Sequence, residues 1–162
     1  MGYILTKKTS SAKGILFAIS KENGYPIRFF LTKTKTLYGI EKFYANRLVK
    51  WVIDSAVYKE LVDFEVELLN SINKYIEKEG LEYESIELVS KILSDSRFPT
   101  MIQTIVEGKS GEVIKHQSGS LVTFNDIIKG FSGNIQLEVK SINISNGKLY
   151  YNIVNKVIEP IE

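Results

Sequence analysis

Residues 1–40 alternate apolar and polar positions with a period of two, which is the pattern of half-buried β-strands. The alternation predicts three strands, at Tyr3–Lys7, Ile15–Ser20 and Ile27–Leu37. Asn23-Gly24, between the last two, is a hairpin signal. This part of the chain is therefore expected to form β-structure.

Residues 41–107 instead place apolar side chains three and four positions apart, which is the pattern of amphipathic helices. The clearest run is Val57, Leu61, Phe64, Leu68, Ile72 and Tyr75. Asp54-Ser55 can cap the start of this helix, and Gly80 stands where a C-terminal cap belongs. Similar spacing predicts a helical segment before Asp54, a helix from Ser85 to Ser94, and a short one from Pro99 to just before Gly108.

Residues 111–162 return to the strand pattern. Two short strands are expected at Glu112–Gln117 and Leu121–Phe124, and a longer hairpin at Ile135–Ser145 and Lys148–Ile158. Asn146-Gly147 supplies the turn of that hairpin. The run IQLEVKSINISNGKLYYNIV, residues 135–154, resembles a strand–turn–strand unit of a small barrel such as the OB-fold, a unit so general that it implies no function.

The order of these elements predicts the fold class. Strands come first, helices second and strands last, without the alternation that builds parallel sheets. We therefore expect one α+β domain over residues 1–162, in which antiparallel sheet packs against three to four helices. Whether the two β segments share one sheet is left open by the pattern.

Composition then removes several kinds of active site. The chain has no cysteine and one histidine, His116. Disulfides, thiol nucleophiles, cysteine-ligated zinc and one-subunit sites with two imidazoles are therefore excluded. No apolar run is long enough to span a membrane, and the first residues lack the apolar core of a signal peptide. We expect a cytoplasmic protein without membrane association, cofactor or metal.

Charged residues are unevenly distributed along the chain, although the net charge is only +2. Residues 1–50 hold ten Lys or Arg and two Glu, so 10 − 2 gives +8. Residues 51–110 hold six bases and twelve acids, so 6 − 12 gives −6. The basic segment is also rich in aromatic residues, and cations interleaved with rings are what single-stranded nucleic acid requires.

This mixture predicts a non-catalytic protein that binds single-stranded or structured nucleic acid on a basic N-terminal β surface. The expected phosphate contacts are Lys7, Lys8, Lys13, Arg28, Lys33 and Lys35. The expected stacking rings are Tyr25 and whichever of Phe29 and Phe30 is exposed. The more common arrangement of such residues is that the rings lie in a hydrophobic core and the lysines lie on an ordinary solvated face.

Two alternatives use the same residues differently. The basic and acidic segments can pair with one another, within one chain or between copies, which predicts an assembly module that self-associates or binds a protein partner. Separately, Glu138-Val139-Lys140 on a strand, with Asp126 a dozen residues upstream, resembles the core of PD-(D/E)xK nucleases. That resemblance implies a divalent cation held by the two carboxylates, with Lys140 near the attacking water.

Overall fold

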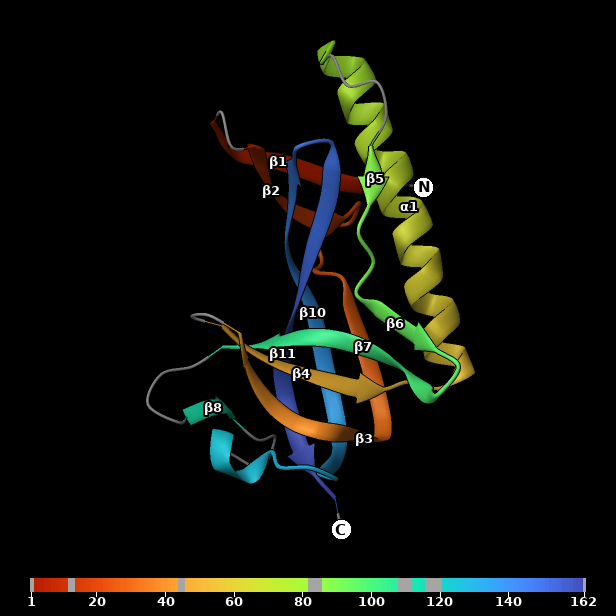
Figure 1. Cartoon of the computed structure of the whole chain (residues 1–162). Coiled ribbons are helices and arrows are strands. Elements are labelled where there is room, and N and C mark those ends of the chain that lie inside the picture. The colour runs from red at the N-terminus through yellow and green to blue at the C-terminus, as the bar shows by residue number, and fades with distance from the viewer. Residues whose placement is uncertain are drawn as a thin grey trace. The chain divides into compact units, whose positions relative to one another are not determined.

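The computed structural model describes residues 2–11, 14–43, 46–81, 86–107, 112–115 and 121–161. The chain forms two compact units, and each is considered by itself (Figure 1). Unit 1 comprises Met1–Ile27, Lys59–Ser90 and Val139–Asn152. Unit 2 comprises Arg28–Tyr58, Lys91–Glu138 and Ile153–Glu162.

Unit 2 is built on a closed barrel of five strands. They are β3 (Arg28–Phe43), β4 (Asn46–Val52), β7 (Phe98–Val106), the first part of β10 (Ser132–Ser145) and the second part of β11 (Lys148–Pro160). The order around the barrel is β10-β3-β4-β7-β11, and β11 pairs with β10 to close it. β7 and β11 are parallel, whereas β4 is antiparallel to both its neighbours. In its number of strands this barrel resembles the OB-fold, which is a five-stranded Greek-key barrel.

A buried polar cluster joins three of these strands inside the barrel. Asn155 on β11 accepts a hydrogen bond of 2.8 Å from Trp51 Nε1 on β4. Its amide nitrogen donates to Thr104 Oγ1 at 2.8 Å and to the carbonyl of Ile105 at 3.0 Å, both on β7. Thr104 in turn donates to the carbonyl of Val49 at 2.9 Å. Both polar atoms of the buried Asn155 side chain are thereby paired, which is the condition for placing an amide in a core.

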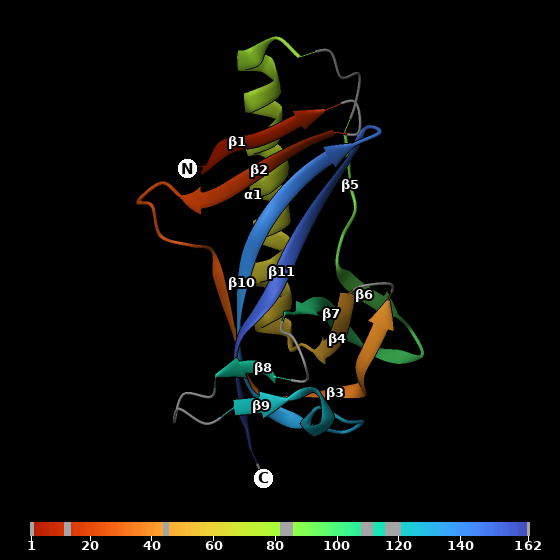
Figure 2. The ribbon, with the colours of Figure 1, turned by 90° about the vertical axis from the view of Figure 1, so that its left-hand side faces the viewer.

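Shorter elements surround the barrel of unit 2. β6 (Ile92–Asp95) pairs with β7 and extends its sheet, and β8 (Glu112–Lys115) pairs with β9 (Leu121–Thr123). The 3-10 helix η1 (Phe124–Asp126) follows β9. Figure 2 shows η1 and the β8–β9 pair close to β3.

Unit 1 combines strands with most of the helix α1 (Ser55–Glu79). β1 (Tyr3–Ser11) and β2 (Gly14–Lys21) form an antiparallel pair, β2 pairs with the end of β10, and β5 (Glu87–Leu88) pairs with the start of β11. Aromatic rings of the helix pack against rings of the strands. The ring centroids of Phe64 and Tyr151 lie 5.2 Å apart, and those of Tyr75 and Phe17 lie 5.0 Å apart. The buried stripe of α1 is the one that the spacing predicts, namely Leu61, Phe64, Leu68 and Ile72.

The predicted ends of α1 are confirmed. Asp54 Oδ1 accepts the amide of Val57 at 2.9 Å, as an N-cap does. At the other end Gly80 has a φ of 64° and the amide of Leu81 donates to the carbonyl of Ile76 at 3.0 Å. This is the glycine-terminated helix end in which the residue after the helix turns left-handed.

The predicted α+β fold with three to four helices is wrong. Among the residues that the structure describes, α1 is the only α-helix, and strands make up most of the remainder. The segments expected to be helical around residues 46–52, 87–95 and 98–106 form β4, β5, β6 and β7 instead.

The physical reason is that β4 and β7 are buried on the inner face and half-buried on the outer face. Val49 and Trp51 point into the barrel, while Leu48 and Val52 on the other face are also half-buried. A strand of this kind carries apolar residues in succession rather than in alternation. Leu48 and Trp51 then fall three positions apart, which imitates the spacing of a helix.

Replacing Asn155 with Leu should lower the free energy of unfolding by about 2–4 kcal/mol, because Trp51 Nε1–H loses its acceptor in the core. Chemical denaturation monitored by Trp51 fluorescence measures the change. The matched control is Asn125→Leu, an exposed position of unit 2, for which a change within about 0.5 kcal/mol is expected. Equal losses in the two variants would contradict a structural role for the Asn155 cluster.

Candidate functional site

An irregularity in β3 of unit 2 turns Tyr38 toward the outside of the barrel. The two strands are in register on either side of it, at Thr36↔Trp51 and at Ile40↔Val49. Between these two pairs, β3 contains residues 37–39, whereas β4 contains only Lys50. Extra residues in one strand bend it and redirect its side chains. Lys50 Nζ lies 5.4 Å from the centroid of the Tyr38 ring, within the range of a cation–π contact.

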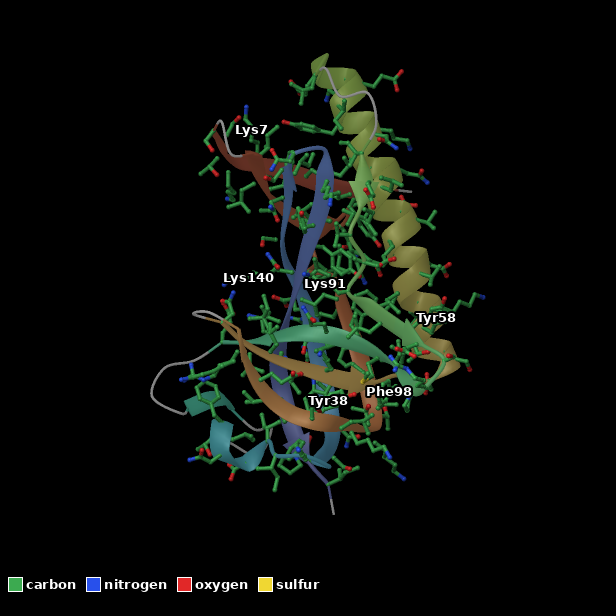
Figure 3. All side chains as sticks on the ribbon, in the orientation of Figure 1. Lys7, Tyr38, Tyr58, Lys91, Phe98 and Lys140 are labelled. Atoms are coloured by element: carbon green, nitrogen blue, oxygen red, sulfur yellow. The ribbon has the colours of Figure 1, made fainter. Side chains whose placement is uncertain are left out.

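Tyr38 forms one wall of an open hollow of about 550 Å³, which we call the apolar hollow. Its apolar lining comes from β6 and β7, namely Ile92, Leu93, Phe98 and Met101. Phe98 is 45% exposed, and its ring centroid lies 6.4 Å from that of Tyr38 at an interplanar angle of 65°. Figure 3 shows the two labelled rings near each other. The hollow therefore offers aromatic faces to a planar ligand.

The two acids of the apolar hollow are each paired with a cation. Glu41 lies 3.3 Å from Lys50, and Asp95 lies 3.0 Å from Arg97. Hydrogen bonds from the Arg97 side chain and backbone hold the pKa of Asp95 below its usual value. Arg97 also lies 5.7 Å from the Phe98 ring centroid. The charged groups on this hollow are thus balanced in sign.

Tyr38 also lines a second open hollow, of about 690 Å³, at the end of the barrel. We call it the basic hollow because its charged lining residues are Lys42, Arg47 and Lys129, and none of the described residues that line it is acidic. Arg47 is held in place by a cation–π contact, with its guanidinium carbon 4.1 Å from the centroid of the Phe124 ring.

Gly39 is what allows the basic hollow to form. Its φ is 73°, and a Cβ at this position would lie 2.9 Å from both the carbonyl oxygen of Ile127 and the carbonyl carbon of Ile128. With no side chain in the way, the segment after η1 lies directly on β3, and the amide of Ile40 donates to the Ile127 carbonyl at 3.1 Å. This close approach brings Lys129 to the side of β3.

Lys42 and Arg47 are cross-strand partners in the β3–β4 pair. Side chains directly opposite each other in antiparallel strands have Cβ atoms about 5 Å apart, and like charges there are destabilising. They lie two residues beyond the Ile40↔Val49 pair, whose Val49 is buried in the barrel. Both cations therefore extend from the barrel's end on the same side of the sheet.

The nucleic-acid contacts expected from the sequence are divided between the two units. Lys7, Lys8 and Tyr25 belong to unit 1 and are exposed there, with Tyr25 67% exposed. Arg28, Phe29, Phe30, Lys33 and Lys35 belong to unit 2. Lys13 lies outside the described residues.

Within unit 2 these residues have different environments. Phe30 is 62% exposed, whereas Phe29 is only 6% exposed and belongs to the core, so Phe30 is the ring that can stack. Arg28 forms an ion pair of 3.0 Å with Glu138. Lys33 and Lys35 are exposed beside a smaller hollow of about 270 Å³. Lys33 has a positive φ of 50°, and its backbone amide donates a hydrogen bond to Asn134 Oδ1.

The residues of the nuclease alternative have other partners. Asp126 Oδ2 accepts hydrogen bonds from the amide and hydroxyl of Thr123, at 2.9 and 3.0 Å. Glu138 lies 3.0 Å from Arg28 and 3.6 Å from Lys156. Lys140 is exposed on the part of β10 that belongs to unit 1. Within the described ranges, no three His, Asp or Glu side chains are grouped as metal ligands.

The two hollows on either side of Tyr38 together form what we call the Tyr38 surface. The sequence patterns did not single out its residues as a site. Tyr38, Lys42, Arg47 and Lys50 lie in the basic N-terminal segment, but the spacing of apolar residues from 41 onward predicts a helix where the structure has the end of β3 and β4. The remaining members, Phe98, Phe124 and Lys129, come from distant parts of the chain. Pairing of strands remote in sequence brings them together, and no local pattern signals it.

Comparison with models of protein families and with curated proteins finds no match to this chain. In the part of the chain that the structure describes, no helix combines the length and hydropathy needed to cross a membrane.

Replacing Gly39 with Ala should destabilise the protein and displace the segment that carries Lys129. Gly130→Ala is the matched control, because Gly130 has a similar φ of 81° but nothing within 4 Å of its Cβ position. Both variants should lose about 1–2 kcal/mol through the left-handed backbone, and Gly39→Ala about 1–3 kcal/mol more through the clash. Chemical denaturation of both variants tests the difference, and equal stability would show that no close approach exists at Gly39.

Proposed function

We propose that this protein binds single-stranded nucleic acid on the surface of unit 2 formed by the two hollows on either side of Tyr38. The observation that carries the proposal is the arrangement of aromatic rings and cations on this surface. Tyr38, Phe98 and Phe124 each lie within 6 Å of a cationic group, with Lys50, Arg97 and Arg47 as the respective partners. Rings for stacking beside cations for phosphates are the combination that binds single strands independently of sequence.

The two hollows suit different parts of a nucleotide. The apolar hollow offers Phe98 and Met101 at a surface whose charges are already paired, which favours a flat and mostly uncharged base. The basic hollow offers three cations, which favours the phosphate backbone. Because Tyr38 lines both hollows, a strand that crosses the surface can stack a base on Tyr38 while its phosphate meets Lys42 or Arg47.

The architecture supports this placement by analogy only. In chain order β4 and β7 are the second and third strands of the barrel. In OB-folds the face of these two strands is the usual site of oligonucleotide binding. Since one architecture hosts many functions, the rings and cations carry the argument and the analogy adds to it.

The proposal keeps the class of ligand expected from the sequence and moves its site. The residues first expected to bind it, from Lys7 to Lys35, lie in both units. The Tyr38 surface lies within unit 2 alone and combines aromatic rings with cations from β3, β4 and the segment after η1.

The decisive variant is Tyr38→Leu, which removes a stacking ring and retains an apolar side chain. Binding to a fluorescently labelled oligo-dT should weaken about 5- to 150-fold, since stacking contributes about 1–3 kcal/mol per base. Fluorescence anisotropy at two salt concentrations measures this, and affinity should fall as salt rises. Tyr25→Leu, at an exposed tyrosine of unit 1, is the matched control and should bind like the unaltered protein.

Each contrary result has a distinct meaning. If Tyr25→Leu or the double variant Lys7→Glu/Lys8→Glu weakens binding while Tyr38→Leu does not, the ligand binds the surface first expected from the sequence. If no oligonucleotide binds and the protein elutes as an oligomer that dissociates in high salt, the protein is an assembly module and the proposal is wrong.

A further inference from the structure

The basic hollow concentrates more positive charge than an internal phosphate of a nucleic-acid strand can balance. Lys42, Arg47 and Lys129 line it, and among its described lining residues there is no carboxylate. The nearby carboxylate of Asp126 accepts two hydrogen bonds from Thr123. An internal phosphodiester carries a single negative charge, whereas a terminal phosphomonoester carries about 1.5 to 2 at neutral pH.

The fold also holds these cations together against their mutual repulsion. Lys42 and Arg47 are directly opposite each other on neighbouring strands, where like charges are unfavourable. Arg47 is fixed by the Phe124 ring, and the glycine at position 39 lets the backbone that carries Lys129 lie against β3. A dianion in the hollow would relieve this repulsion, and the Arg47 guanidinium is already positioned by its contact with Phe124.

The hollow is large enough for the end of a strand. Its volume of about 690 Å³ exceeds what one phosphate group occupies and is within the range of small-molecule sites. The exposed Ile128, at 64%, and the ring of Tyr38 form apolar parts of its rim. These can contact the sugar and base of the terminal nucleotide. Because Tyr38 lines both hollows, the following nucleotides of the strand can lie over the apolar hollow.

We infer that the basic hollow binds the terminal phosphomonoester of a nucleic-acid strand through Lys42, Arg47 and Lys129. The inference rests on the proposed function, since it assigns the end of a strand to one hollow and its interior to the Tyr38 and Phe98 rings. The protein would therefore distinguish phosphorylated from unphosphorylated strand ends.

The test compares one oligonucleotide with four kinds of end: 5′-phosphate, 3′-phosphate, hydroxyl at both ends, and a methyl ester of the end phosphate. A phosphate at one of the two ends should strengthen binding about tenfold over hydroxyl. The methyl ester, which has one negative charge, should lose most of this advantage. Anisotropy at a fixed, near-physiological salt concentration measures all four.

Variants locate the effect in the basic hollow. Lys129→Gln should reduce the preference for a phosphorylated end from about tenfold to about threefold or less, because a dianionic terminal phosphate loses more than an internal phosphodiester when one of the three cations is removed. Lys35→Gln, at an exposed lysine elsewhere in unit 2, is the matched control and should keep the full preference.

Contrary outcomes separate this inference from the proposed function. Equal affinity for all four oligonucleotides, with binding still weakened by Tyr38→Leu, would overturn the strand-end site and leave nucleic-acid binding intact. Competition by a nucleoside monophosphate as effective as that by the phosphorylated strand would assign the hollow to a free nucleotide instead. Failure of every oligonucleotide to bind would overturn the proposed function itself.

Discussion

The barrel of unit 2 depends on one buried asparagine. Asn155 hydrogen-bonds to Trp51 on β4 and to Thr104 and Ile105 on β7, so one side chain connects three strands. It lies where the parallel strands β7 and β11 meet, and their ladder is in register at the neighbouring pair Val154↔Ile105. Parallel pairing is slightly less stable per residue than antiparallel pairing. Side-chain hydrogen bonds in a dry interior stabilise the β7–β11 pair and specify which of its residues lie opposite each other.

Closure of the barrel at the β7–β11 pair also determines which side chains lie on its outer surface. With β4 held between β3 and β7, the extra residues of β3 opposite Lys50 must bulge, and the bulge presents Tyr38 outward. Gly39, next to it, lets the Ile127–Lys129 segment lie on β3. Core packing, a glycine contact and a bulge thus place rings and cations from four separate segments on one surface. The unfavourable Lys42–Arg47 pairing is a local charge conflict of the kind found at binding sites.

The parts of the fold that the sequence predicts correctly are those set by local signals. Asp54 and Gly80 mark the ends of α1, and Asn146-Gly147 marks the turn of the long hairpin. The prediction failed at β4 and β7, where burial of both faces erases the alternation on which a strand assignment relies. The same limit applies to the site, because Phe124 and Phe98 reach the Tyr38 surface only through strand pairing that is remote in sequence. Charge sorting did identify the segment that supplies Tyr38, Lys42, Arg47 and Lys50, but alternation could not tell that Phe29 is buried and Phe30 exposed.

We propose above that single-stranded nucleic acid binds to unit 2 on the surface around Tyr38. A titration of the isotopically labelled protein with oligo-dT, followed by amide chemical shifts in NMR spectra, tests it most directly. We expect the largest shifts on residues 38–42, 47–50, 92–98 and 124–129, the segments that supply most of the lining of the two hollows. Shifts confined to β1, β2 and the turn at Tyr25, or no shifts at all, would contradict it.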